Sequence, residues 1–249
     1  MEAIKHYIGP YIERDVYCTD DRGYLNLSLY LDNPQCSLYW SSSLGEKNRF
    51  KLRFRSYTSD TDGFVILEIK RRINQVILKE RAKMHREVIP LIFSGAPISD
   101  SLFIRDSPGD RVAFHNFRSL VERIQAGPKI FVRYNREAYS GSNGQDVRLT
   151  IDHNLATREC DFYSHELWRD NHDWHAVEAP IVFEIKFNGA FPQWVQTLIR
   201  HFNLRQESYS KYVSCLQNLH NRGAMNSLLK CRGEDPLWAS KELLWDIAN

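Results

Sequence analysis

Alternating apolar and polar positions recur in seven segments of this chain. In the first of them, residues 24–32, four leucines alternate with asparagine, serine, tyrosine and aspartate. Successive side chains of a β-strand point to opposite faces, so the pattern predicts strands with one apolar and one polar face. The predicted strands span residues 24–32, 50–57, 64–70, 76–81, 130–136, 146–152 and 181–187. So many strands of this kind favour one large antiparallel sheet.

Apolar residues at helical spacing are less frequent. They predict helices at residues 4–12, 111–125, 192–206, 208–221 and 237–247. The glycines and serines of residues 139–146 predict a hairpin loop. No low-complexity linker divides the chain, so we expect a single α+β domain over residues 1–249, with its helices packed on the apolar strand faces.

The polar strand faces carry an excess of positive charge. The cations on them are Lys51, Arg53, Arg55, Lys70, Lys79, Arg81, Arg136, Arg148 and Lys186. The anions on them are Asp32, Glu68, Asp152 and Glu184. A face that only meets water should mix both signs, as the whole chain does with 33 basic and 31 acidic residues.

Two interpretations of these faces remain open. In the first, each face is simply solvated. In the second, the sheet closes with its charged face inward, and the lumen binds a polyanion, since buried like charges need counter-ions. Arginine and lysine would then hold phosphates, and the carboxylates would hold a divalent metal that bridges them.

Composition narrows the class of protein further. The net charge of +2 gives no overall field that would favour nucleic acid. No stretch approaches the ~18 consecutive apolar residues of a membrane helix. The five cysteines include no CxxC pair, which is typical of reduced thiols in a cytoplasmic protein and argues against a zinc ribbon. The polar stretch from His172 to His175 predicts a solvated loop.

Eight short motifs carry a family resemblance. In chain order they read SLYLD, KLRFRSY, LEIKRR, LKERA, VRYNREAY, RLTID, VFEIKF and SKY. Together they resemble the VTC (vacuolar transporter chaperone) domain, in the polyphosphate polymerase branch of the triphosphate tunnel metalloenzyme (CYTH-like) superfamily. The resemblance extends from about residue 4 to residue 213, and we expect residues 222–249 to form a C-terminal helical extension. It implies a closed antiparallel β tunnel with helices outside.

The resemblance also implies a role for each matching residue. Those with a catalytic role are Ser210, Lys211, Arg136 and Arg148, of which Ser210 and Lys211 would lie near the terminal phosphate. Those that bind substrate phosphates are Lys51, Arg53, Arg55, Lys70, Lys79, Arg81, Tyr134 and Lys186. Glu184, or Glu68 in the same EIK pattern, would bind Mn²⁺ or Mg²⁺. Asp32 and Asp152 would orient arginines.

The implied function is polyphosphate synthesis. Members of the family that make polyphosphate transfer the γ-phosphate of ATP to a growing chain. Two alternatives stay open: hydrolysis of a triphosphate on the same fold, and non-catalytic binding of polyphosphate or inositol phosphates. The reaction product discriminates between all three.

The resemblance sets the expected context as well. Relatives carry a first strand of the form RYE-K before the initial helix. No counterpart is present here, so we expect either an upstream stretch of this kind or a reduced domain. We further expect a stand-alone bacterial, cytoplasmic protein that binds ATP and polyphosphate, works beside a separate membrane protein, and neither enters the membrane nor binds nucleic acid.

Overall fold

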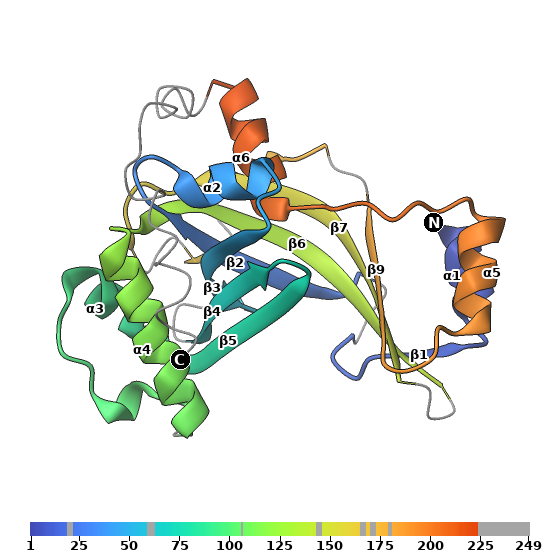
Figure 1. The fold of residues 1–249 in the computed structure, drawn as a ribbon, viewed down its shortest axis with the longest axis horizontal. Coiled ribbons are helices and arrows are strands. Elements are labelled where there is room, and N and C mark those ends of the chain that lie inside the picture. The colour runs from blue at the N-terminus through green and yellow to red at the C-terminus, as the bar shows by residue number, and fades with distance from the viewer. Residues whose placement is uncertain are drawn as a thin grey trace. The chain divides into compact units, whose positions relative to one another are not determined.

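A computed structural model describes residues 1–18, 22–58, 63–105, 107–142, 146–164, 168–169, 173–178 and 181–223. These residues form nine strands and six α-helices (Figure 1). The strands are β1 (Ile12–Arg14), β2 (Tyr24–Asp32), β3 (Asn48–Ser56), β4 (Phe64–Ile73), β5 (Val76–His85), β6 (Gly127–Gly141), β7 (Val147–Glu159), β8 (His175–Ala176) and β9 (Val182–Phe187). The helices are α1 (Glu2–Ile8), α2 (Ser37–Ser43), α3 (Val88–Ser94), α4 (Pro108–Arg123), α5 (Gln193–His201) and α6 (Lys211–Asn221), and a 3₁₀ turn, η1, spans Asp100–Leu102.

The sheet is antiparallel and, among the described residues, open. Its hydrogen-bonded order is β5-β4-β3-β2-β6-β7-β8, with β1 added to β6 and β9 added to β7. The predicted antiparallel α+β architecture is therefore confirmed. Closure into a tunnel is not confirmed, because no described strand pairs with the outer edge of β5, where Met84 forms an isolated bridge with Phe103. The opposite end strand, β8, is only two residues long and pairs with β7 alone.

The chain divides into two compact units. One unit contains residues 1–25, 134–155 and 178–209. The other contains residues 26–133, 156–177 and 210–249, of which the structure describes residues up to 223. We call the first the β9 unit and the second the β3–β5 unit, after strands that lie wholly within them.

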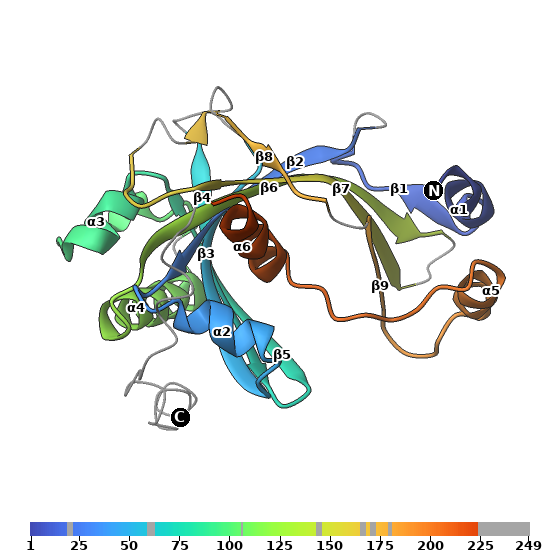
Figure 2. The ribbon, with the colours of Figure 1, turned by 90° about the horizontal axis from the view of Figure 1, so that it is seen from above.

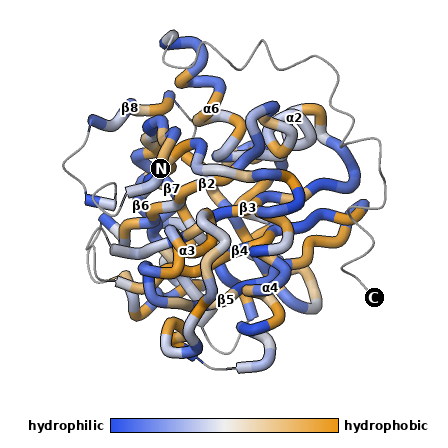
Figure 3. Tube along the Cα trace, turned by 90° about the vertical axis from the view of Figure 1, so that its left-hand side faces the viewer, coloured by the Kyte–Doolittle hydropathy of each residue, from blue (hydrophilic) through white to orange (hydrophobic). Residues whose placement is uncertain are grey.

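The core of the β3–β5 unit lies between the apolar strand faces and α3 and α4. Leu52 and Phe54 of β3 are fully buried, and the Phe54 ring lies 5.1 Å from the Phe117 ring of α4. The apolar positions of these strands lie in the core, as the alternation predicts, and Figure 3 shows hydrophobic and hydrophilic segments side by side in this part of the chain. In Figure 2, α4 and α6 lie on opposite sides of β3–β5, so α6 lies on the side of the polar face.

The β9 unit has its own core. Leu149 and Ile151 of β7 pack with Trp194 and Leu198 of α5 and with Ile8 of α1. The aromatic rings of residues 11 and 194 stack in parallel at 5.1 Å. The helices again cover the apolar face of the strands, which leaves the opposite face to the polar residues of β7 and β9.

Each of the seven predicted strands overlaps an observed one. Four of the five predicted helices correspond to α1, α4, α5 and α6. The predicted helix at 237–247 lies outside the described residues, as do His172 and residues 143–145 of the predicted β6–β7 hairpin loop. Four cysteines, at positions 18, 36, 160 and 215, are buried and form no disulfide with one another. No helix in the described ranges is long and apolar enough to cross a membrane.

Candidate functional site

Three lysines form a row across β3, β4 and β5. The strand register pairs Lys51 with Lys70, and Lys70 with Lys79. Lys79 and Lys70 are exposed, whereas Lys51 is half-buried. Burial, together with the charges of Lys70 and three further cations, lowers the pKa of Lys51 to about 7. Like charges in direct opposition are unfavourable, so this row favours an anionic partner.

The start of α6 meets this row. Lys51 Nζ donates a hydrogen bond of 2.7 Å to Ser210 Oγ. The same hydroxyl caps α6, because it accepts a hydrogen bond of 3.3 Å from the backbone amide of Val213. Lys211 follows in the first turn, and its charge contributes to the lowered pKa of Lys51. Ser210 and Lys211, both predicted to lie near the terminal phosphate, thus adjoin the lysine row.

A second row places a glutamate between arginines. The register pairs Arg53 with Glu68, and Glu68 with Arg81. Glu68 accepts a hydrogen bond from Arg53 on Oε1 and one of 2.9 Å from Arg81 on Oε2, and Arg55 Nη1 lies 4.0 Å from Oε2. Burial opposes ionisation of Glu68, but the three arginines outweigh it and lower its pKa to about 2. Its carboxylate is therefore ionised, and each oxygen is engaged by an arginine.

Two tyrosines connect the arginine row to α6. Arg53 Nη1 donates to the hydroxyl of Tyr30 at 2.9 Å. The Tyr30 ring stacks on Tyr212 of α6, with centroids 5.0 Å apart, and the Tyr212 hydroxyl donates to Asp32 Oδ2 at 2.6 Å. Neither tyrosine was predicted as a site residue, although Tyr30 shares the polar face of β2 and Tyr212 ends the SKY motif.

Asp32 has a role different from the predicted one. It contacts no arginine among the described residues, but accepts backbone hydrogen bonds of 2.9 Å from Leu38 and Tyr39 in the first turn of α2. Burial raises its pKa to about 6, although Tyr212 and the backbone donors oppose this rise. The carboxylate therefore joins α2 and α6 to the end of β2.

In the β9 unit, an arginine and an aspartate form a bidentate pair. Arg136 Nε and Nη2 lie 2.6 and 2.7 Å from the two carboxylate oxygens of Asp152. Burial disfavours the charge of Arg136, but the pairing outweighs it and raises its pKa. The guanidinium also lies 5.4 Å from the centroid of Tyr134. The predicted role of Asp152 as the residue that orients an arginine is confirmed.

A glycine allows the chain to pass close to Arg136. Gly23 has a φ of +71°, and a Cβ at this position would lie 2.3 Å from the carbonyl oxygen of Arg136. Any side chain would therefore require the backbone of β6 to move. This close contact helps to fix the strand segment that carries Arg136.

Further site candidates lie on β7 and β9. The register pairs Arg148 with Lys186, and Thr150 with Glu184. Arg148 Nη2 lies 3.2 Å from Asp15, and Lys186 Nζ lies 3.0 Å from Glu184 Oε1. The side chains of Arg148, Lys186 and Glu184 are each about half exposed, at 51%, 52% and 44%. They are accessible to a ligand.

The fit of a divalent metal differs between the two candidate ligands. Glu184 is accessible, and Mg²⁺ or Mn²⁺ can be held by one carboxylate when phosphate oxygens and water complete the coordination. Glu68 would need an arginine to turn away first. No cluster of three or more histidine, cysteine, aspartate or glutamate side chains occurs among the residues that the structure describes. Glu184 is therefore a better candidate ligand for Mg²⁺ or Mn²⁺ than Glu68.

The predicted site residues therefore fall into two groups. The β3–β5 unit contains Lys51, Arg53, Arg55, Glu68, Lys70, Lys79, Arg81, Ser210 and Lys211. The β9 unit contains Tyr134, Arg136, Arg148, Glu184 and Lys186. Each group lies on the polar strand face of its own unit, except that Ser210 and Lys211 lie at the start of α6.

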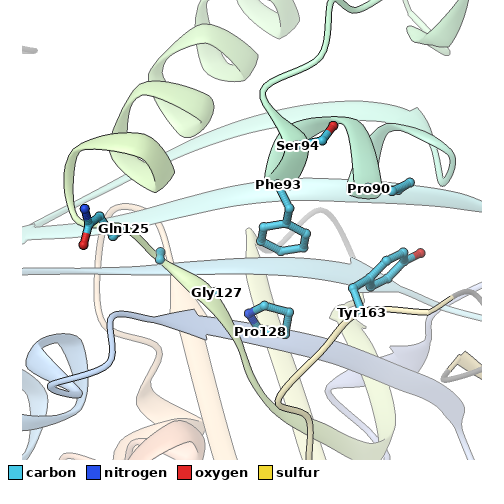
Figure 4. A pocket seen from close by; sticks show the side chains of 8 residues that line it. Pro90, Phe93, Ser94, Gln125, Gly127, Pro128 and Tyr163 are labelled. Atoms are coloured by element: carbon cyan, nitrogen blue, oxygen red, sulfur yellow. The ribbon is translucent and has the colours of Figure 1, made fainter.

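A separate pocket of about 510 Å³ lies on the apolar side of the β3–β5 unit (Figure 4). Phe93 of α3 and Tyr163 point into it, with ring centroids 6.3 Å apart, and Pro90, Gln125 and Pro128 are among the other residues that line it. The lining carries no charged side chain. It therefore does not suit phosphate.

The family model of the VTC domain matches residues 1–220. The chain belongs to the VTC domain family. No curated protein matches it. Among solved structures, it is similar to the crystal structure of a putative adenylate cyclase from Bacillus halodurans, with 12% identity over 84% of this chain and 88% of the other, and a TM-score of 0.44. Membership of the VTC domain family supports a polyphosphate-related, phosphotransfer role.

Proposed function

We propose that this VTC domain is a polyphosphate polymerase, which transfers the γ-phosphate of ATP to the end of a polyphosphate chain. One observation carries the proposal: the Lys51–Lys70–Lys79 row and its hydrogen bond to Ser210 at the start of α6. A linear row of cations suits a linear polyanion. At one end of the row, the Ser210 hydroxyl and the first backbone amides of α6 suit the reacting phosphate.

The residues would act chiefly by positioning and by charge. The attacking group is a terminal phosphate oxygen that is already ionised, so no strong protein base is needed. The lysine row would hold the phosphates in line, and Arg53 and Arg55 would bind the triphosphate of the nucleotide. Lys211 would stabilise the charge that develops on the transferred group.

The candidate residues of the β9 unit would bind phosphate on the polar face of that unit. Asp152 holds the guanidinium of Arg136 in one orientation, so this group is already positioned when a phosphate ligand arrives. Arg148 and Lys186 would bind phosphate oxygens from β7 and β9. Glu184 would hold Mn²⁺ or Mg²⁺, and when bound such an ion neutralises phosphate charge.

A product assay tests the proposal. Purified protein is incubated with ATP and Mn²⁺, and the products are resolved on a gel stained for polyphosphate. We expect a ladder of long chains that disappears in Lys211→Met and after chelation of the metal. Lys47→Met is the matched control, because it removes the same charge from an exposed position just before β3; it should keep the ladder.

The other products identify the other functions. Orthophosphate or pyrophosphate without a ladder would indicate a triphosphate hydrolase. Salt-dependent binding of triphosphate without any turnover would indicate a binding module. Either result would contradict the polymerase.

A further inference from the structure

Three neighbouring side chains in the β3–β5 unit carry buried polar groups that have no hydrogen-bond partner among the described residues. Both side-chain polar atoms of Asn26 and the hydroxyl of Ser28 have none among the described residues, and neither does Arg55 Nε. Asn26 is 1% exposed, Ser28 is 0% exposed and Arg55 is 7% exposed. Buried polar groups in folded proteins are nearly always paired, so three such groups together need an explanation.

The strand geometry gathers these groups on one face. Ser28 of β2 lies directly opposite Arg55 of β3 in the register. Directly opposed residues have Cβ atoms about 5 Å apart, and diagonal neighbours remain within reach of long side chains. Asn26 lies two residues before Ser28, so both project from the polar face of β2, as Tyr30 does. The group is therefore contiguous with the arginine row.

Arg55 is the most loosely held arginine of this row. Its ion pair with Glu68 measures 4.0 Å, whereas Arg81 donates to the same oxygen at 2.9 Å. A phosphate that replaced this weak ion pair would lie beside Ser28, which is directly across the strand pair, and near Asn26.

We propose that Asn26 and Ser28 donate hydrogen bonds to one phosphate group of the substrate, beside the charge of Arg55. This inference rests on the proposed function only in that the ligand is a phosphate chain. The asparagine amide offers two N–H donors and the serine hydroxyl offers one, and phosphate oxygens accept them. Neutral donors add contacts without a further buried positive charge, which would repel the three arginines already present.

This role has a consequence that a structural role lacks. Replacing an unpaired buried polar group by an apolar group of the same shape is neutral or stabilising for the folded protein. Asn26→Leu and Ser28→Ala should therefore leave stability unchanged or raise it, while they weaken ligand binding. A residue whose hydrogen bonds serve the fold would behave in the opposite way.

The chain provides matched controls. Asn33 is buried like Asn26, but its amide donates to Ser37 Oγ and accepts from Ser37 N, both at 2.9 Å. Ser41 is buried like Ser28, but its hydroxyl donates to the carbonyl of Leu38 at 3.1 Å. Asn33→Leu and Ser41→Ala should lower stability and leave the affinity for phosphate as it is.

The experiment measures the dissociation constant of inorganic triphosphate by calorimetry and the urea midpoint for each variant. We expect Asn26→Leu to weaken binding at least tenfold and Ser28→Ala about threefold, with unchanged or higher midpoints. Ser28→Ala serves alone if Asn26→Leu does not fold. Parent affinity in both variants would overturn the inference, and would leave ordered water as the partner of these groups.

The same data separate this inference from the proposed function. If the two variants lose affinity but the parent makes no polymer from ATP, the phosphate contacts stand and the polymerase reaction fails. If the parent makes polymer and the variants bind triphosphate normally, the reaction stands and the contacts fail. A parent that binds no triphosphate overturns both.

Discussion

The hydroxyl of Tyr212 donates a hydrogen bond of 2.6 Å to the carboxylate of Asp32. Both residues are buried, and the same carboxylate accepts the first backbone amides of α2. The bond therefore holds the first turn of α6 against the polar face of β2. Ser210 and Lys211 immediately precede Tyr212, so their position beside the lysine row depends on this bond.

Tyr212→Phe should therefore affect both stability and reaction rate. A hydrogen bond to a charged group contributes about 1.5–3 kcal/mol, so we expect a loss of that order in the free energy of unfolding, measured in urea. The yield of polyphosphate per unit time should fall while the affinity for triphosphate changes little. Tyr11→Phe is the control, because the hydroxyl of Tyr11 makes no hydrogen bond to a described residue. Equal rates in both variants would contradict the role given to Tyr212.

The lowered pKa of Lys51 predicts a pH dependence of binding. Lys51 loses its proton near pH 7 in the folded protein, and a bound phosphate would restore it. The affinity for triphosphate should thus decrease as the pH rises above about 7, with proton uptake on binding. Calorimetry in buffers of different ionisation enthalpy measures this uptake. The Lys51→Met variant lacks this proton, so its proton uptake on binding measures the titration of the ligand alone.

The same shift predicts a rise in stability with pH. Unfolded Lys51 keeps its proton to the ordinary value of 10.5, whereas folded Lys51 loses it near pH 7. Between these values the unfolded chain binds more protons, so the contribution of Lys51 to the unfolding free energy increases with pH across this window. Urea unfolding at several pH values should show a flatter profile for Lys51→Met than for the parent. Parallel profiles would contradict the prediction.

The polar faces of β2–β5 could be predicted from alternation alone. The period of two places Lys51, Arg53 and Arg55 on one face, and the structure keeps them there. The partners on that face depend on strand register, which the alternation does not specify. The ion pairs of Glu68 with Arg53 and Arg81, and the contact of Lys51 with Ser210, therefore emerged only from the structure.

Short elements were missed for a simpler reason. Strands β1 and β8 contain three and two residues, too few to show alternation. Helices α2 and α3 lack apolar residues at helical spacing: the apolar residues of α2 (SLYWSSS) are consecutive, and α3 (VIPLIFS) is apolar almost throughout and contains a proline. The anchoring of α2 by Asp32 was also missed, because an aspartate in a predicted strand gives no sign that it caps a helix five residues later.

Glu68→Gln should destabilise the protein and increase the stabilisation that it gains from a bound anion. The change leaves Arg53, Arg55 and Arg81 without their shared counter-charge, which costs about 3 kcal/mol for a buried pair. Thermal unfolding should show a lower midpoint, and inorganic triphosphate should raise that midpoint further than it does in the parent. Glu122→Gln is the control, since Glu122 is 55% exposed and pairs with Arg118 one turn away on α4, so the change should cost about 1 kcal/mol or less. Equal ligand-induced shifts in Glu68→Gln and the parent would argue against anion binding on this face.

Adjacent residues of β3 should respond to substitution in opposite ways. Leu52 is fully buried on the apolar face, so Leu52→Ala should cost about 2–5 kcal/mol of stability and leave ATP affinity unchanged. Arg53→Ala, and likewise Arg55→Ala, should weaken ATP binding. Urea unfolding and equilibrium binding of ATP measure the two effects separately. Parent-like ATP affinity in both arginine variants would refute the assignment of the polar face.

The close approach of Gly23 to Arg136 also limits how this protein can vary. Position 23 lies outside both groups of candidate site residues. Because Gly23 has no Cβ, the carbonyl oxygen of Arg136 can lie only 2.3 Å from the point that a Cβ would occupy. Even alanine would displace the backbone that carries a candidate phosphate-binding arginine. In a library that samples every amino acid at every position, residue 23 should therefore be among the least tolerant, and functional homologues should keep glycine there even where the surrounding loop changes in length and composition.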